Sequence, residues 1–175
     1  MLTKKQISDA LQALNDSLGR KSLKGEIGLV GGGALCLAFN AREATKDLDA
    51  IFAPTAEIRV CALEVASEFG LPVDWLNDAV KGYLPGEPAQ RDIIWSGDNL
   101  TVWVPPANYL LAMKVAASRA DTNDIEDIVF LAKLLKLNSA MSVRQIAEQF
   151  YGTAIPQRAH YILEELEETG RLKDQ

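Results

Sequence analysis

Histidine and cysteine are scarce in this chain of 175 residues, which holds one histidine and two cysteines. The cysteines, Cys36 and Cys61, are distant in the sequence, and neither belongs to a Cys-x-x-Cys pair. A zinc site built from His and Cys ligands is therefore not expected. Two buried thiols in a reducing compartment are the simplest interpretation of this cysteine content.

Long apolar runs are missing as well. No stretch approaches the roughly 20 consecutive apolar residues that span a bilayer. The N-terminal segment 1–19 lacks the apolar stretch and small-residue cleavage site of a secretory signal, and its apolar residues instead follow helical spacing. We therefore expect a cytoplasmic protein with no membrane partner.

Basic residues are outnumbered, with 18 Lys and Arg against 24 Asp and Glu and a net charge of −6. A broad nucleic-acid-binding face is not expected from this balance. Segment 141–170 has the rhythm of a helix–turn–helix, which suggests DNA binding. Its second helix carries four carboxylates that repel phosphate, Glu164, Glu165, Glu167 and Glu168. We therefore expect no sequence-specific DNA binding and assign these helices to packing.

Apolar residues make up 48% of the chain, enough to fill a core. Strands are predicted at 26–30, 47–52, 73–76, 92–96 and 100–104, and helices at 3–18, 34–40, 55–69, 107–118, 122–137, 142–151 and 157–169. This order predicts an α/β (α+β) protein with a short mixed sheet and an all-helical C-terminal third. The expected divisions are an N-terminal helix (1–24), an α/β core (25–120) and a helical part packed on that core (121–175).

Segment 28–52 is the most informative part of the chain. Three glycines, Gly31 to Gly33, follow a short apolar strand and precede a helix, and such a turn presents backbone N–H groups to a phosphate. Asp47 and Asp49 share one face of the next strand, with Cα atoms about 7 Å apart. Two such carboxylates repel each other unless a cation lies between them, and Mg²⁺ binds one or two carboxylates with water and phosphate oxygens. The segment therefore suits metal-assisted phosphoryl or nucleotidyl transfer.

This pattern resembles the polymerase-β-like nucleotidyltransferase superfamily, in which an apolar residue and Gly-Gly or Gly-Ser precede a helix and an Asp-apolar-Asp pair. Here Val30-Gly31-Gly32-Gly33 is followed by Asp47-Leu48-Asp49-Ala50. The superfamily often has Ser after the second glycine, where this chain has Gly. The sheet is accordingly expected to be of nucleotidyltransferase type.

Further residues make the resemblance more specific, toward the AbiEii/MenT-type branch, whose members include toxins of toxin–antitoxin systems. It covers roughly residues 25–135. The additional matching residues are Arg42, Thr45 and Lys46 before the Asp pair, and Lys114, Arg119, Asp124 and Asp127 after it.

The resemblance implies a role for each residue. Asp47, Asp49 and Asp74 would bind Mg²⁺, and Asp74 would also activate the acceptor hydroxyl. The substrate would be a nucleoside triphosphate (NTP), held by Gly31, Gly32 and Gly33 and by Lys114, with help from Arg42 or Lys46. The acceptor would be an RNA or protein hydroxyl, and a cognate partner protein would accompany a toxin-type enzyme.

Other interpretations remain open. The Asp pair is also compatible with an exposed strand face, and Asp74 with the end of a loop. Lys114 is as compatible with a snorkelling lysine as with a phosphate ligand. Asp124 and Asp127 suit the first turns of a helix, or a salt-bridge network around Lys114. The alternative function is a non-catalytic binding module or partner protein with the same fold.

Overall fold

The computed structural model describes residues 1–117 and 122–173, and the chain divides into two compact units. The core unit comprises residues 1–82 and 90–105, and the helical unit comprises 83–89 and 106–175. Helix α4 (Ala107–Ala117) belongs to the helical unit, whereas the sequence analysis assigned it to the core. The change of unit coincides with Pro105 and Pro106, which end the last strand.

A five-stranded mixed sheet forms the centre of the core unit, with strand order β5-β4-β2-β7-β6. Strand β2 pairs antiparallel with β4 and parallel with β7, β4 pairs parallel with β5, and β6 pairs antiparallel with β7. The strands are β2 (Gly25–Leu29), β4 (Leu48–Ala53), β5 (Leu76–Asn77), β6 (Asp92–Ser96) and β7 (Leu100–Val104). The predicted mixed α/β class and the predicted hairpin of β6 and β7 are confirmed.

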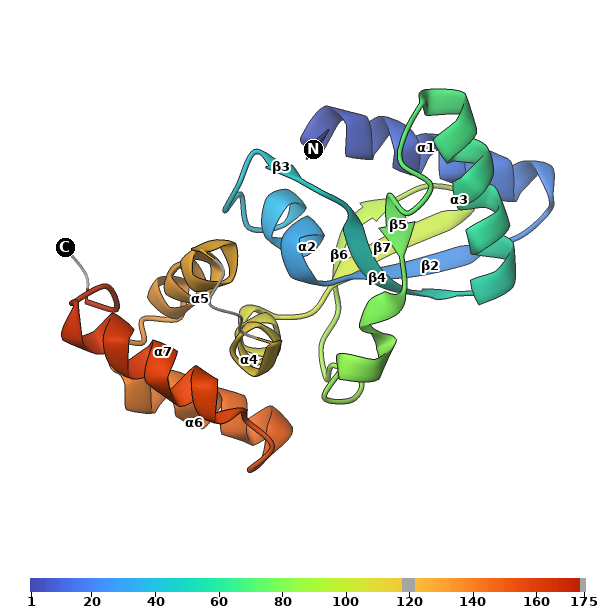
Figure 1. Ribbon diagram of the computed structural model, residues 1–175. Helices are drawn as coiled ribbons and strands as arrows, with labels where there is room; N and C mark the ends of the chain where they lie inside the picture. Colours follow the sequence, from blue (N-terminus) through green and yellow to red (C-terminus); the bar gives the residue numbers. More distant parts are fainter. Residues whose placement is uncertain (118–121, 174–175) are drawn as a thin grey trace. The chain divides into compact units, whose positions relative to one another are not determined.

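Helices α1 (Lys4–Arg20) and α3 (Thr55–Phe69) lie against the sheet and against each other (Figure 1). A capping box on Thr3 begins α1, and Gly70 in the left-handed conformation ends α3. Leu18 of α1 and Ile58 of α3 both reach the backbone of Gly25 in β2. Apolar residues of both helices therefore close the core on this face of the sheet.

The opposite face of the sheet carries Asp49, and we term it the Asp49 face. Side chains alternate along each strand, so the residues that share this face follow from the register. They are Glu26 and Gly28 of β2, Asp49, Ile51 and Ala53 of β4, and Thr101 and Trp103 of β7.

Four helices make up most of the described helical unit: α4, α5 (Thr122–Leu134), α6 (Ala140–Tyr151) and α7 (Gln157–Glu168). Two tyrosine hydroxyls tie the segment 83–89 to this unit: Tyr109 Oη donates to the Gly86 carbonyl (2.6 Å) and Tyr151 Oη to the Tyr83 carbonyl (2.7 Å). Within the described residues, no helix has the length and apolar character needed to cross a membrane.

Candidate functional site

The three glycines begin a helix directly, without an intervening turn. Helix α2 (Gly31–Leu37) starts at the first glycine, three residues before the predicted start at residue 34. Gly31 has φ +58°, and this left-handed conformation turns the extended chain at Val30 straight into the helix. The N-cap residue is Val30, whose side chain cannot accept from the first N–H groups of the helix.

The glycines also allow β4 and the short strand β3 (Ala44–Thr45) to approach the start of α2 closely. A Cβ atom on Gly31 would lie 3.0 Å from Asp49 Oδ2, and one on Gly32 would lie 2.7 Å from Thr45 Oγ1. A backbone hydrogen bond also joins β4 to the start of α2: the N–H of Val30 donates to the Asp49 carbonyl at 2.9 Å. Asp49 therefore lies beside the glycines that begin α2.

Asp47 lies directly before β4, and Asp49 is the second residue of that strand. Burial is the main cause that raises the pKa of the Asp47 carboxyl above its usual value, and the nearby charges of Asp49 and Asp74 raise this pKa further. Lys46, which is exposed, acts in the opposite direction. A bound cation would relieve this concentration of negative charge.

Asp74 is exposed and lies in a turn rather than on a strand. The predicted strand 73–76 is wrong: the N–H of Trp75 closes a turn onto the Pro72 carbonyl (3.0 Å), and β5 begins at Leu76. Trp75 is fully buried, and its Nε1 donates to the Ala62 carbonyl of α3 (2.9 Å). This tertiary anchoring of the tryptophan holds Asp74 outside the strand.

Asn77, and not Asp74, occupies the position beside Asp49 on the neighbouring strand β5. Strands β4 and β5 are parallel, and Asp49 and Asn77 are direct partners in their register. The Oδ1 atom of Asn77 accepts from the N–H of Ala79 at 3.2 Å. Sequence reasoning missed Asn77 because the start of β5 depends on the burial of Trp75, which local strand propensity does not reveal.

A metal ion at this site would have two carboxylate ligands from the chain. The described residues contain no group of three or more His, Cys, Asp or Glu side chains that could hold a metal ion. Asp74 is therefore near enough to affect the pKa of Asp47 but does not complete a cage with Asp47 and Asp49. Two carboxylates still fit Mg²⁺, which takes its other ligands from water and phosphate.

Arg42 is a predicted site residue that borders the glycines. A Cβ atom on Gly32 would lie 3.3 Å from Arg42 Nη1, so the half-buried guanidinium borders the start of α2. Its charge also lowers the pKa of the buried Cys36 thiol, although burial raises this pKa overall. Arg42 is therefore placed to meet an anion at the glycine turn.

Lys114 belongs to the helical unit, where its ammonium group binds Asp124 and Asp127 at 2.8 Å each. The lysine side chain is 17% exposed and that of Asp127 is 4% exposed. The salt-bridge network that the sequence analysis considered is thus present. Arg119 lies outside the described residues, and a role for Lys114 in phosphate binding stays a prediction.

Comparison with protein-family models, curated proteins and solved structures finds no match to this chain. The resemblance to nucleotidyltransferases therefore depends on the motif residues themselves. The functional argument depends on the geometry around Gly31, Asp47 and Asp49.

Proposed function

We propose that this protein is a Mg²⁺-dependent nucleotidyltransferase that moves a nucleoside monophosphate from an NTP to a hydroxyl of RNA or protein. One observation carries the proposal: the Asp49 carboxylate abuts the Gly31 backbone at the start of α2, with Asp47 two residues earlier. A carboxylate pair beside an uncapped glycine turn brings together the groups that bind a metal and those that bind a phosphate.

Each residue has a definite task in this reaction. Asp47 and Asp49 hold Mg²⁺, which neutralises charge on the phosphates and polarises the α-phosphoryl group when bound. The N–H groups of Gly31 to Gly33 and the guanidinium of Arg42 orient the triphosphate.

The transfer itself is a displacement at the α-phosphorus. The acceptor oxygen forms a bond to this phosphorus while the bond to the bridging oxygen breaks, and pyrophosphate leaves with that bonding pair. The hydroxyl proton passes to the Asp74 carboxylate and from there to solvent. Because Asp74 is exposed, it can release this proton directly to water.

A transfer assay with each of the four α-labelled NTPs, Mg²⁺ and total RNA or total protein as acceptor tests the proposal. We expect label on one class of acceptor, and loss of at least about 100-fold in rate with Asp49→Asn. Asp98→Asn removes an equal charge from the exposed turn between β6 and β7 and is the matched control. No labelled product with any NTP, or equal rates for wild type and Asp49→Asn, would overturn the proposal.

A toxin-type role would also be measurable as an effect on the growth of the host. Expression of the wild-type chain is then expected to arrest growth of the host, and Asp49→Asn is expected to relieve that arrest. Relief by co-expression of a neighbouring gene product would identify the cognate partner protein. Normal growth on expression of an active wild-type enzyme would contradict the toxin role while leaving the transferase proposal intact.

The second candidate is a non-catalytic binding module with the same fold. The identity of residue 77 favours it, because the place beside Asp49 holds an amide that cannot accept a proton. A module of this kind would bind Mg²⁺ and NTP but transfer nothing to any acceptor. Binding of Mg²⁺ and NTP without transfer to any acceptor would thus distinguish the module from the enzyme.

A further inference from the structure

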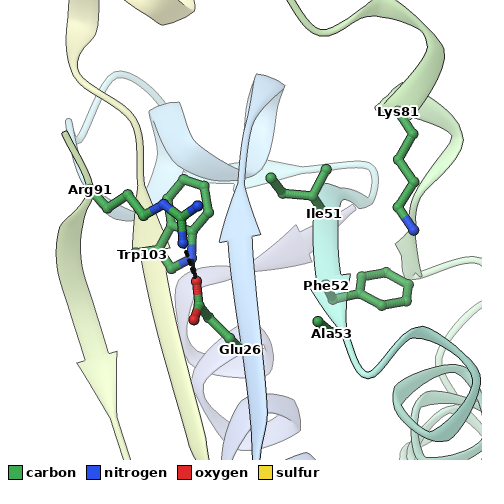
Figure 2. Close-up of a pocket in the computed structure, with 7 residues that line it drawn as sticks. All are labelled: Glu26, Ile51, Phe52, Ala53, Lys81, Arg91 and Trp103. Atoms are coloured by element: carbon green, nitrogen blue, oxygen red, sulfur yellow. Dashed lines mark hydrogen bonds and ion pairs between the residues drawn. The ribbon is translucent and has the colours of Figure 1, made fainter. Parts of the chain in front are cut away.

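A second feature lies on the Asp49 face, in the part of the sheet remote from the glycine turn. It is a shallow pocket with a volume of about 250 Å³, formed within the core unit (Figure 2). The lining residues are Glu26, Ile51, Phe52, Ala53, Lys81, Arg91 and Trp103.

One wall of the pocket is a stack of an aromatic ring and a cation. The Trp103 ring lies directly over Gly28, where any Cβ atom would overlap it. The Trp103 indole N–H donates to Glu26 Oε1, and the Arg91 guanidinium lies 4.5 Å from the ring centroid. Arg91 also donates to the same Glu26 oxygen at 2.7 Å. Gly28 leaves room for the Trp103 ring, and Glu26 holds both the ring and the Arg91 guanidinium in place.

The opposite wall carries a second cation, as Figure 2 shows. Lys81, in the 3₁₀ helix η1 (Ala79–Tyr83), lies 2.8 Å from Asp78 and 5.5 Å from the Phe52 ring centroid. Asp78 in turn accepts from Arg59 through both carboxylate oxygens at 2.7 Å. These contacts hold the ammonium group at the pocket, across Ile51 from the Arg91 wall.

The pocket and Asp49 lie along the same strand, β4. Ile51 and Ala53 lie two and four residues after Asp49 on the same face of β4, which corresponds to about 7 Å and 13 Å along the strand. A ligand in the pocket would therefore lie within one or two nucleotide units of Asp49.

We propose that this pocket binds a nucleoside monophosphate unit of the acceptor. The apolar floor and the stack of Trp103 and Arg91 suit a base, because bases stack on arginine and on aromatic rings. The cations of Lys81 and Arg91 suit its phosphate. The inference rests on the proposed function and narrows it: the acceptor is a nucleotide, either free or as the end of a single-stranded RNA, and not a protein.

Binding in EDTA tests the pocket separately from the metal site. The probes are a free nucleoside monophosphate and a short fluorescent single-stranded RNA, titrated into wild type, Arg91→Gln and Lys81→Gln. Arg20→Gln removes a charge from the exposed end of α1 and is the matched control. Melting temperatures check that each variant is folded.

We expect Arg91→Gln and Lys81→Gln each to weaken binding about tenfold, since a hydrogen bond to a charged group contributes about 1.5–3 kcal/mol. Arg20→Gln is expected to stay within about twofold of wild type, below the tenfold that corresponds to 1.4 kcal/mol. Tighter binding of RNA than of the mononucleotide identifies an RNA end as the acceptor, and equal binding identifies a free nucleotide. Unchanged binding of both probes by Arg91→Gln and Lys81→Gln would overturn the inference.

The two proposals fail in different ways. If wild type transfers label in an Asp49-dependent manner but the pocket variants bind both probes normally, the pocket inference is wrong and the proposed function stands. If the pocket variants lose binding but wild type transfers nothing, the pocket binds nucleotide and the proposed transferase function is wrong.

Discussion

Asp49 on β4 and Asn77 on β5 are direct partners across a parallel strand pair, so an amide stands beside the Asp49 carboxylate. An amide oxygen can bind a metal ion or a hydroxyl, but it brings no charge and accepts no proton. The site therefore has a smaller negative charge than three carboxylates would give. This difference sets the expected metal affinity and can be changed by one substitution.

Asn77→Asp restores a third carboxylate at this position. An aspartate can still accept from the Ala79 N–H, so the start of η1 is preserved. We expect Mg²⁺ affinity to rise about tenfold, since a unit charge a few ångströms from a divalent ion contributes at least about 1 kcal/mol. Calorimetric titration with Mg²⁺ measures this. Asn99→Asp adds the same charge in the turn between β6 and β7, beside the start of β2 and thus at the end of that strand opposite Gly31, and an equal gain there would contradict a site at Asp49.

Comparing Gly31→Ala with Gly70→Ala distinguishes the effect of backbone strain from the effect of contact with Asp49. Gly31 and Gly70 both have left-handed φ angles, +58° and +62°. A Cβ atom added to Gly31 would lie 3.0 Å from the Asp49 carboxylate, whereas one added to Gly70 would meet nothing within 4 Å. We expect each alanine variant to lose about 1–2 kcal/mol of unfolding free energy. Only Gly31→Ala should also weaken Mg²⁺-dependent NTP binding. Equal NTP binding by the two variants would show that Asp49 does not need this geometry.

Asp47→Asn tests the electrostatic cost of the carboxylate pair. The folded protein raises the pKa of Asp47 above 3.8, so it holds this proton more tightly than the unfolded chain does. Folding stability contributed by this group is therefore lost as the pH rises from below 3.8 through the folded pKa. At pH 7 we expect Asp47→Asn to melt higher than wild type.

Two conditions should reduce this difference in melting temperature between Asp47→Asn and wild type. Below the unfolded pKa of 3.8 both forms of residue 47 are neutral, so the melting temperatures should converge. Saturating Mg²⁺ should stabilise wild type more than Asp47→Asn, because the amide lacks the charge of the carboxylate. A melting temperature of Asp47→Asn that stays below that of wild type at pH 7 would contradict this account of the carboxylate pair.

Lys114→Met distinguishes a structural lysine from one that binds phosphate. Because Asp127 is nearly buried, loss of the ammonium group should cost about 3 kcal/mol of unfolding free energy. The double variant Lys114→Met/Asp127→Leu removes both charges and should recover much of that stability. If Lys114 binds the phosphates, the double variant stays inactive in the transfer assay. Recovered transfer would leave the lysine a purely structural role.

Local signals predicted much of the fold because the relevant residues act over short distances. The hairpin of β6 and β7 follows from strong β formers on both sides of Gly97-Asp98-Asn99. The end of α3 follows from Gly70, which adopts the left-handed conformation. The strand order was not predictable, because the parallel pairing of β2 with β7 joins segments far apart in the chain.

Part of the candidate site was likewise predictable from local signals, and part was not. The approach of Asp49 to Gly31 follows from a strand, a short helix and a second strand in succession, which the motif contains. Asn77 was missed because the burial of Trp75 against α3 determines where β5 begins. The pocket could not be predicted either, since Trp103 reaches Glu26 across the parallel pair of β7 and β2.

Calorimetric titration of a non-hydrolysable NTP tests the central claim most directly, with wild type and Asp49→Asn measured in Mg²⁺ and in EDTA. The account predicts binding by wild type that requires Mg²⁺ and weakens at least about tenfold, or 1.4 kcal/mol, with Asp49→Asn. Wild-type binding that is the same in EDTA, equal binding by Asp49→Asn, or no binding by wild type in Mg²⁺ would contradict a metal–nucleotide site at Asp47 and Asp49.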